Sequence, residues 1–271
     1  MKSLILNFLK YIKYCSGGGY TQLTLSPIQY PALLQGKRAL VTGGSEGIGL
    51  AIARKFVEAG AIVIITGRNL QKLERAAQEV KSERLVTMQW DVCDISRMDE
   101  RLAEIESKIG GLDIWVNNAA YVTNNYSTEQ VWDRTMDTNV KAPYFLTRAV
   151  AEYMKLMNGV EGGKIINISS INAYQSWHHP YFVSKRALNM LTEGFAKEYA
   201  PYNILVNAVA PGFCDSSINK QDASKNAYWP DAANRRITVP QDIAEIVMFL
   251  CSGAANGIVG QTIVCDGGTL L

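Results

Sequence analysis

The sequence is poor in the side chains that bind metal ions and build disulfide frameworks. Its 271 residues contain two histidines, His178 and His179, which are adjacent, and five cysteines without any Cys-x-x-Cys spacing. Zinc sites need several sulfur or nitrogen ligands at suitable spacing, and disulfide-stabilised proteins carry a framework of paired cysteines. We therefore predict no metal site and no Cys–His catalysis, and we expect reduced thiols in a cytoplasmic protein.

The chain also lacks a strong charge of either sign. Its formal net charge is +2, and no stripe of basic residues alternates with aromatic ones. Nucleic acid is therefore not an expected partner. Internal repeats and low-complexity tracts are absent too, which excludes solenoids and biased segments. Hydrophobic residues make up 48% of the sequence, which is enough for a large core.

Residues 1–36 differ from the rest of the chain. Ile5, Phe8, Leu9 and Ile12 stand at helical spacing among lysines, and a run of glycines follows at 17–19. The apolar run is too short to span a bilayer, and no signal-peptide cleavage site follows it. We expect a basic amphipathic helix and then an extended arm. The helix either packs on its own subunit or frays, or it makes a peripheral contact with a membrane surface or a partner.

From residue 37 to residue 271, short apolar runs alternate with amphipathic helical patterns without a break. This alternation predicts one α/β domain, a doubly wound parallel sheet with helices on both faces. About seven strands are expected, beginning near Arg38, Ala61, Leu85, Asp113, Lys164, Ile204 and Thr262. The polar stretch 213–237 is weakly periodic, which is typical of a lid over a substrate or of a surface insertion in oligomer contacts.

A glycine-rich turn joins the first expected strand to the first expected helix. It runs from Thr42 and Gly43 through Gly47 to Gly49, and apolar residues at helical spacing follow. Glycines let the backbone approach a pyrophosphate, and the start of the helix offers free N–H groups to it. A tight turn that needs glycine for its own dihedral angles is the simpler alternative. The order of strand, turn and helix favours a dinucleotide site.

Tyr181 and Lys185 stand four residues apart, shortly after Ser169 and Ser170. This spacing places the two side chains on one face of a helix. A lysine ammonium near a phenol favours the phenolate, so it lowers the tyrosine pKa from its usual value of about 10. The pair predicts a proton donor and acceptor that works near neutral pH. Taken alone, the pattern is equally typical of a tyrosine packed beside a solvated lysine.

Together, and in this order, these motifs resemble the short-chain dehydrogenase/reductase family from Leu34 to the end of the chain. The family's Thr-Gly-x-x-x-Gly-x-Gly turn is matched in full. The further matches are Asn117–Ala120, Asn139, Ser170, Tyr181, Lys185, Pro211-Gly212 and Asp266–Gly268. Two departures stand out. Ala120 replaces a glycine of the family pattern, and the interval from Ser170 to Tyr181 is shorter than the family's, which leaves Ser169 as the alternative serine.

The resemblance implies an oxidoreductase that transfers a hydride between a nicotinamide cofactor and a carbonyl or alcohol substrate. Tyr181 would move the proton, Ser170 would hold the substrate oxygen, Lys185 would tune the tyrosine, and Asn139 would anchor a water molecule. The implied cofactor-binding residues are Thr42, Gly43, Ser45, Glu46, Gly47, Ile48, Gly49, Arg68, Asn69, Asp91, Val92, Asn118, Ala119, Ala120, Tyr181, Lys185, Pro211, Gly212 and Phe213.

The end of the second expected strand bears on the choice of cofactor. NAD sites usually carry an acidic residue there, whereas this chain has Gly67 and then Arg68. An arginine pairs with the 2′-phosphate of NADP, so NADP(H) is favoured over NAD(H). Glu46 points the other way, while Ser45 offers the phosphate a hydrogen bond. Asp91 either contacts the adenine side or caps the turn that ends its strand.

The substrate is less well defined by the sequence. Its pocket is expected to come from residues 171–180 and 213–237, which include Tyr174, Gln175 and Trp177. A catalytically silent NADP(H)-binding scaffold or sensor is the alternative function. A sugar-nucleotide epimerase or dehydratase is disfavoured because little sequence follows Asp266–Gly268. The resemblance also implies a homodimer or homotetramer, with contacts through residues 241–250 and the last strand, although the apolar residues there are equally typical of core.

Overall fold

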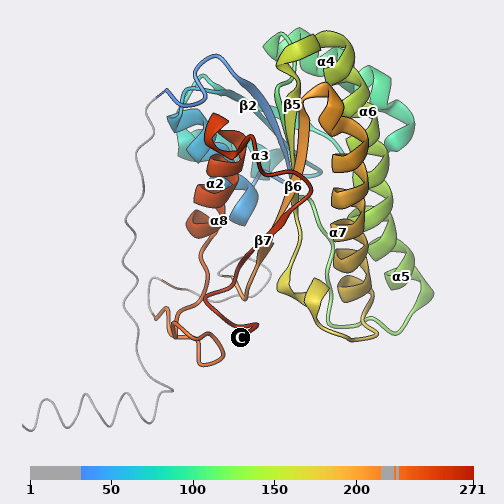
Figure 1. The fold of residues 1–271 in the computed structure, drawn as a ribbon, viewed down its shortest axis with the longest axis vertical. Coiled ribbons are helices and arrows are strands. Elements are labelled where there is room, and N and C mark those ends of the chain that lie inside the picture. The colour runs from blue at the N-terminus through green and yellow to red at the C-terminus, as the bar shows by residue number, and fades with distance from the viewer. Residues whose placement is uncertain (1–31, 215–222, 224–225) are drawn as a thin grey trace, which may run out of the picture.

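The fold is built on seven parallel strands in one sheet (Figure 1). The computed structural model describes residues 32–214, 223 and 226–271. The strands are β1 (Arg38–Thr42), β2 (Ile62–Gly67), β3 (Leu85–Gln89), β4 (Ile114–Asn117), β5 (Gly163–Ile168), β6 (Ile204–Pro211) and β7 (Thr262–Cys265). They lie in the order β3-β2-β1-β4-β5-β6-β7. Each begins within one residue of its predicted start, and the doubly wound fold is confirmed.

Helices cover both faces of this sheet. One face carries α2 (Gly47–Glu58), α3 (Leu70–Val80) and α8 (Pro240–Cys251). The other carries α4 (Met98–Ile109), α5 (Glu129–Met136), α6 (Ala142–Met157) and α7 (Pro180–Tyr199). Successive side chains of a strand point to opposite faces, so Ala39 and Val41 join one core cluster while Leu40 joins the other. Strands buried on both sides need apolar residues throughout, which is why they read as continuous apolar runs.

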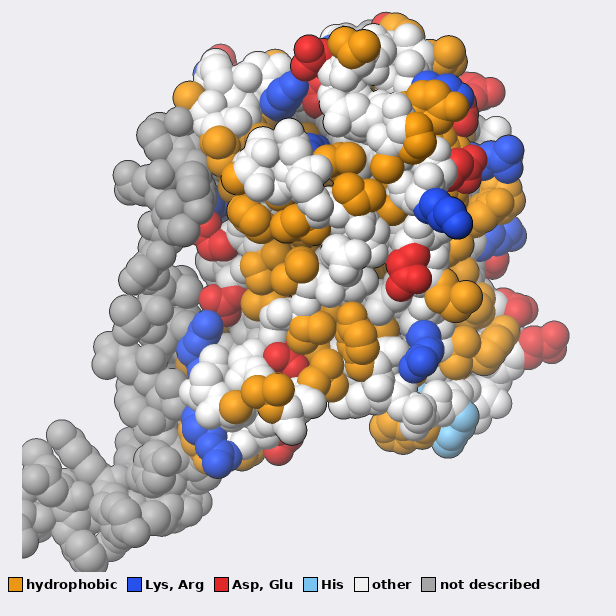
Figure 2. Space-filling model, viewed as in Figure 1, with side chains coloured by type: hydrophobic (Ala, Val, Ile, Leu, Met, Phe, Trp, Pro, Cys, Tyr) orange, Lys and Arg blue, Asp and Glu red, His pale blue; other side chains and the backbone are white. Residues whose placement is uncertain are grey.

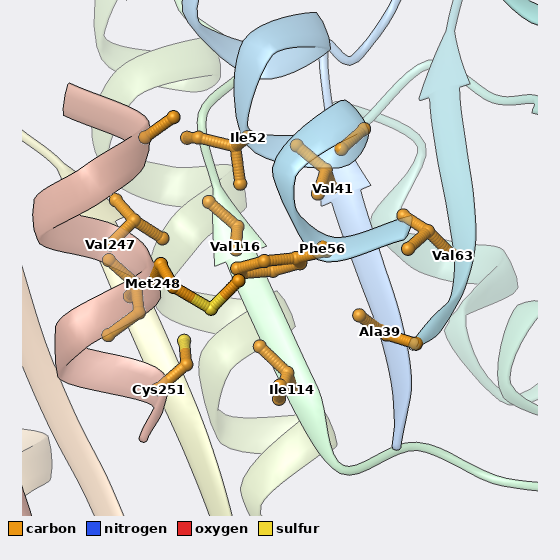
Figure 3. Packing of buried hydrophobic residues seen from close by; sticks show 14 of the residues in the cluster. Ala39, Val41, Ile52, Phe56, Val63, Ile114, Val116, Val247, Met248 and Cys251 are labelled. Carbon is orange, nitrogen blue, oxygen red and sulfur yellow. The ribbon is translucent and has the colours of Figure 1, made fainter. Parts of the chain in front are cut away.

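The helix α8 belongs to the core rather than to the surface. Figure 3 shows Phe56 of α2 against Met248 of α8, with Ile114 and Val116 of β4 beneath them. Six α8 residues are buried, and Phe249 is its large exposed hydrophobic side chain. Of the two alternatives for residues 241–250, the structure therefore supports intrachain core.

The edge strand β7 is the part of the expected contact region that stays exposed. Val264 of β7 is 39% exposed, and Figure 2 shows hydrophobic side chains along the middle of the face on which β7 lies in Figure 1. The homodimer or homotetramer stays a prediction. The expected amphipathic helix in residues 1–36 lies outside the described residues. Every helix in the described ranges is too short or too polar to span a membrane.

The expected lid, residues 213–237, folds in part against its own small cluster. Ala223, Ala227 and Ile237 are buried with Val239, and Phe213 packs against the same cluster. Isolated bridges pair Cys214 with Thr238 and Tyr228 with Arg236. These contacts fix the described part of this segment beside the carboxyl ends of β6 and β7.

Candidate active site

A large cavity lies at the carboxyl ends of the strands. Its volume is about 1250 Å³, and its walls come from the segments that follow β1, β2, β3, β4, β5 and β6. The carboxyl ends of parallel strands all lie at one edge of the sheet. The segments that follow the strands therefore meet there, although they are far apart in sequence. The predicted residues that line this cavity are Gly43, Ser45, Glu46, Gly47, Ile48, Arg68, Asn69, Asp91, Val92, Asn118, Ala119, Ala120, Ser170, Tyr181, Lys185, Pro211, Gly212 and Phe213.

The remaining predicted residues, Thr42, Gly49 and Asn139, support the cavity from behind its wall. Thr42 Oγ1 accepts hydrogen bonds from the backbone N–H groups of Asn118 and Ala119 at 2.9 and 3.0 Å. In return, Asn118 Nδ2 donates to the Thr42 carbonyl at 2.9 Å. These bonds join the turn after β1 to the segment after β4, so they hold two walls of the cavity together.

The glycine turn needs glycine for two separate reasons. Gly43 and Gly47 have φ angles of +63° and +58°, which side chains other than glycine rarely adopt. Gly49 has an ordinary φ, but a Cβ atom there would collide with the carbonyl oxygen of Gly43. The turn therefore packs tightly onto the first turn of α2 and leaves backbone at the cavity surface.

A salt bridge that the sequence did not reveal crosses the cavity beside this turn. Glu46 occupies the N-cap position of α2 without capping it. Its two carboxylate oxygens instead accept from Lys72 Nζ at 3.0 Å each. Lys72 lies in the first turn of α3, where Asn69 caps the helix by accepting from the Lys72 N–H at 2.9 Å. No local pattern in the sequence marks this salt bridge, because Glu46 and Lys72 lie 26 residues apart.

Arg68 and Asp91 line the cavity at the end where the glycine turn lies. Gln89 Nε2 donates to the Arg68 carbonyl at 2.9 Å, which fixes the Arg68 backbone. Asp91 Oδ1 accepts from the Cys93 N–H at 3.0 Å. Asp91 therefore caps the turn after β3, as one of its two predicted roles required, and it also lines the cavity.

At the other end of the cavity, Ser170, Tyr181 and Lys185 come together. Ser170 lies close enough to Tyr181 to favour its phenolate and so to lower its pKa, and Ser170 Oγ accepts from the Asn172 N–H at 3.2 Å. Ser169 instead binds the Asn189 side chain on α7. The short interval before Tyr181 is accommodated because a 3₁₀ turn, Ile171–Tyr174, begins directly after Ser170. Of the two serines, the geometry pairs Ser170 with the tyrosine.

Lys185 is buried beneath Tyr181. Its side-chain nitrogen Nζ donates to the Ile168 carbonyl at 2.7 Å and lies 5.5 Å from the centroid of the Tyr181 ring. Burial lowers the pKa of Lys185 to about 8. Burial also raises the pKa of Tyr181 to about 12, although the neighbouring Ser170 hydroxyl lowers it. The expected lowering of the Tyr181 pKa is therefore wrong for this structure, because loss of hydration outweighs the favourable contacts.

Asn139 lies in a π-helical turn, Asp137–Lys141, between α5 and α6. Its Nδ2 atom donates to the Tyr121 carbonyl at 2.9 Å and to Ser184 Oγ at 3.1 Å, while Oδ1 accepts from the Tyr121 N–H at 2.7 Å. Both amide protons are therefore used by protein groups. The side chain ties the cavity wall at Tyr121 to helix α7.

The expected substrate walls are only partly present. Ile171, Asn172 and Gln175 line the cavity, as do Phe213, Cys214, Trp229 and Asp231 from the later segment. Tyr174 lies instead at a second cavity of about 540 Å³ beside β7. Lining residues that the sequence analysis missed include Lys72, Tyr121 and Arg134. Arg134 lies with its guanidinium carbon 4.3 Å from the Tyr121 ring centroid, a contact between separate elements that has no local sequence pattern.

The burial of Lys185 makes a prediction about stability. Its pKa falls from 10.5 to about 8 on folding, so the unfolded chain binds more protons between these values and stability rises with pH across that window. At pH 7 the charged form is present in both states, and its burial costs about 3 kcal/mol. Lys185→Met removes this cost and loses one hydrogen bond from a charged group, worth about 2 kcal/mol.

We expect Lys185→Met to unfold at a higher denaturant concentration than the wild type at pH 7, with the gain shrinking as the pH rises toward about 10. Lys197→Met, an exposed position on the same helix, is the matched control and should change little. Chemical denaturation followed by circular dichroism measures both. Lower stability of Lys185→Met at pH 7 would contradict the buried-charge account.

Comparison with known proteins agrees with this geometry. Residues 37–227 match the family described as short chain dehydrogenase. Human dehydrogenase/reductase SDR family member 4 is 40% identical over 249 residues, 87% of this chain and 88% of its own. The 3-oxoacyl-(acyl-carrier-protein) reductase FabG of Aquifex aeolicus is 32% identical over 245 residues, 87% of this chain and 98% of its own.

A solved structure extends the agreement to the fold. The crystal structure of a short-chain type dehydrogenase/reductase from Mycobacterium marinum aligns with a TM-score of 0.80 at 31% identity, over 89% of this chain and 97% of its own. The chain therefore belongs to the short-chain dehydrogenase/reductase family, as an oxidoreductase that uses NAD(P)(H) and acts on a small molecule.

Proposed function

We propose that this protein is an NADP(H)-dependent carbonyl reductase, with Tyr181 as the proton donor and the reverse alcohol oxidation open to the same site. The observation that carries the proposal is the assembly of Ser170, Tyr181 and Lys185 in one wall of the large cavity. The alternative of a catalytically silent scaffold gains no support from the site, because a binding module has no need of a partly buried phenol above a buried ammonium.

The residues around the glycine turn fit a dinucleotide. Gly49 leaves no room for a Cβ atom and Gly43 has a positive φ, so the backbone of the turn packs close to α2 and lines the cavity at Gly43 and Gly47, where a pyrophosphate would need it. When bound, the nicotinamide ring supplies a hydride to a carbonyl carbon or accepts one from an alcohol.

The protein's own groups then manage the proton. Because burial holds the pKa of Tyr181 at about 12, the phenol is protonated at neutral pH and can give its proton to the substrate oxygen. Ser170, which lines the same part of the cavity as that phenol, would hold the same oxygen in place. The buried Lys185 ammonium would stabilise negative charge as it develops on the tyrosine. A water molecule on Asn139 would bind its backbone carbonyl, since both side-chain amide protons are used.

Three side chains at the far end of the cavity support NADP(H) over NAD(H). Arg68 and Lys72 both line this end, and each can pair with a 2′-phosphate through charge-assisted hydrogen bonds. Ser45 adds a hydroxyl beside Gly67. Glu46 opposes a phosphate, but its carboxylate is paired with Lys72 through both oxygens, which offsets its charge.

The substrate end supports a ketone or aldehyde with a flat apolar part. Phe213 and Trp229 stack with ring centroids 4.0 Å apart and an interplanar angle of 6°, and both line the cavity. Asn172 and Gln175 lie on the opposite segment and offer amide groups to polar substituents. A ring-shaped or polyhydroxylated carbonyl compound fits this combination.

Two further observations support a location and an oligomeric state for the enzyme. Cys93, Cys251 and Cys265 are free thiols, which supports a reducing, cytoplasmic location. The position of β7 at the edge of the sheet formed by the described residues and the exposed Val264 support assembly into a homodimer or homotetramer.

Tyr181→Phe tests the proposed chemistry. Removing the hydroxyl removes the proton donor while leaving the ring in place, so we expect carbonyl reduction to fall by about 100-fold or more. NADPH binding, followed by nicotinamide fluorescence, should be kept. Tyr174→Phe is the control, because Tyr174 is exposed and lies at the other cavity. Full turnover in Tyr181→Phe would reject the role of this residue and favour the scaffold alternative.

Variants at the far end test the choice of cofactor. Arg68→Ala and Lys72→Ala should each weaken NADPH binding about tenfold and leave NADH binding nearly unchanged, since one charge-assisted bond to a phosphate is lost. Glu46→Gln should strengthen NADPH binding by removing a negative charge. Arg75→Ala, on α3 but outside the cavity, is the control. Wild-type preference for NADH would overturn the NADP(H) proposal.

A further inference from the structure

His179 is a buried polar side chain for which the proposed chemistry has no use. It lies two residues before Tyr181, is 8% exposed, and occupies the N-cap position of α7. Both of its ring nitrogens face backbone groups. Nδ1 accepts from the Tyr181 N–H at 3.0 Å, and Nε2 lies 3.1 Å from the Thr123 carbonyl oxygen.

These two partners fix the protonation of the ring. A backbone N–H only donates and a carbonyl oxygen only accepts, so Nδ1 must be unprotonated and Nε2 must carry the proton. The ring is therefore neutral and in one tautomer. Three aromatic rings contact it: Tyr126 at a centroid distance of 4.1 Å, Phe182 at 5.8 Å and Trp177 at 6.5 Å.

Capping alone does not require a histidine. Asparagine, aspartate, serine and threonine are the preferred N-cap residues, and any of them could accept from the first N–H groups of the helix. What the imidazole adds is a second bond on the far side of the ring, to Thr123. One rigid side chain thus spans from the backbone of Tyr181 to the segment after β4.

The segment at Thr123 forms the facing wall of the cavity. Its neighbours Tyr121 and Val122 line the cavity, and Tyr121 is held by Asn139. The distance between Tyr181 and this wall is therefore set by two independent links: Asn139 through Ser184 on α7, and His179 through Thr123. The link through Ser184 lies beside Lys185, and the link through His179 lies at the start of α7.

We propose that His179 is a positioning residue for Tyr181. Its neutral ring fixes the first turn of α7 against the wall at Thr123, so that the Tyr181 hydroxyl meets the substrate oxygen at a defined place. The proposal rests on the proposed carbonyl reduction for its kinetic consequence, since small displacements of a catalytic group cost rate more than binding. Its structural consequence, a fixed Tyr181 backbone N–H, does not depend on the reaction.

Three variants of the full chain separate the two bonds. In His179→Asn, Oδ1 takes the place of Nδ1 and keeps the bond to Tyr181, while the bond to Thr123 is lost. In His179→Gln, the longer amide reaches toward Thr123 and leaves the Tyr181 N–H without its acceptor. His179→Ala removes both bonds. His178→Ala, at the exposed neighbour, is the matched control.

We expect His179→Ala to lower kcat for reduction of a ketone about tenfold or more with little change in KM for NADPH. His179→Asn should recover most of the lost kcat, whereas His179→Gln should not. Hydrogen exchange read by mass spectrometry should show the Tyr181 amide protected in the wild type and in His179→Asn, and exposed in the other two. His178→Ala should match the wild type in both measurements.

Equal kcat in His179→Ala and the wild type would overturn the proposal. So would equal loss in the asparagine and glutamine variants, a comparison that stands even where the alanine variant does not fold. A wild type that reduces no carbonyl compound would count against the proposed function instead. In that case amide exchange alone decides, and an unprotected Tyr181 N–H in the wild type would reject the positioning role.

Discussion

The amino group of Lys185 is buried at the carboxyl end of β5, and the arrangement of the active site depends on it. An ammonium group in the protein interior is costly unless it is hydrogen-bonded, and here the bond goes to the Ile168 carbonyl at 2.7 Å. The lysine lies beneath Tyr181 and adds a charged group to this part of the cavity wall. A buried cation beside a partly buried phenol is an arrangement that stability alone does not favour, which is typical of a site kept for chemistry.

A ladder of buried polar groups joins α7, the helix that carries Tyr181 and Lys185, to the sheet. Asn117 at the end of β4 donates to Asn167 of β5 at 2.8 Å, and Asn167 donates to Thr192 of α7 at 2.8 Å. Such networks are specific because each unpaired member would carry the full cost of its lost hydration. The ladder holds one side of α7, and the N-terminal bonds of His179 hold its start, so Tyr181 lies on a helix fixed at two levels.

Local patterns in the sequence predicted the sheet well, because parallel strands buried on both faces must be apolar along their whole length. The site residues near the glycine turn and on α7 were also within reach, since each lies at a strand end or on one helix face. The direction of the Tyr181 pKa was predicted wrongly: the lysine one turn away is visible in the sequence, whereas the loss of hydration is not. The salt bridge of Lys72 and the two hydrogen bonds of His179 join elements that meet only in the folded chain. No local spacing in the sequence predicts them.

We propose that burial keeps Tyr181 protonated as a proton donor, and an ultraviolet difference titration between the wild type and Tyr181→Phe tests this directly. Phenolate absorbs where phenol does not, so the difference isolates one tyrosine among the 13 in the chain. The account predicts no phenolate difference below about pH 10, the usual tyrosine pKa. A difference that titrates near neutral pH would contradict it and would show that Lys185 outweighs burial.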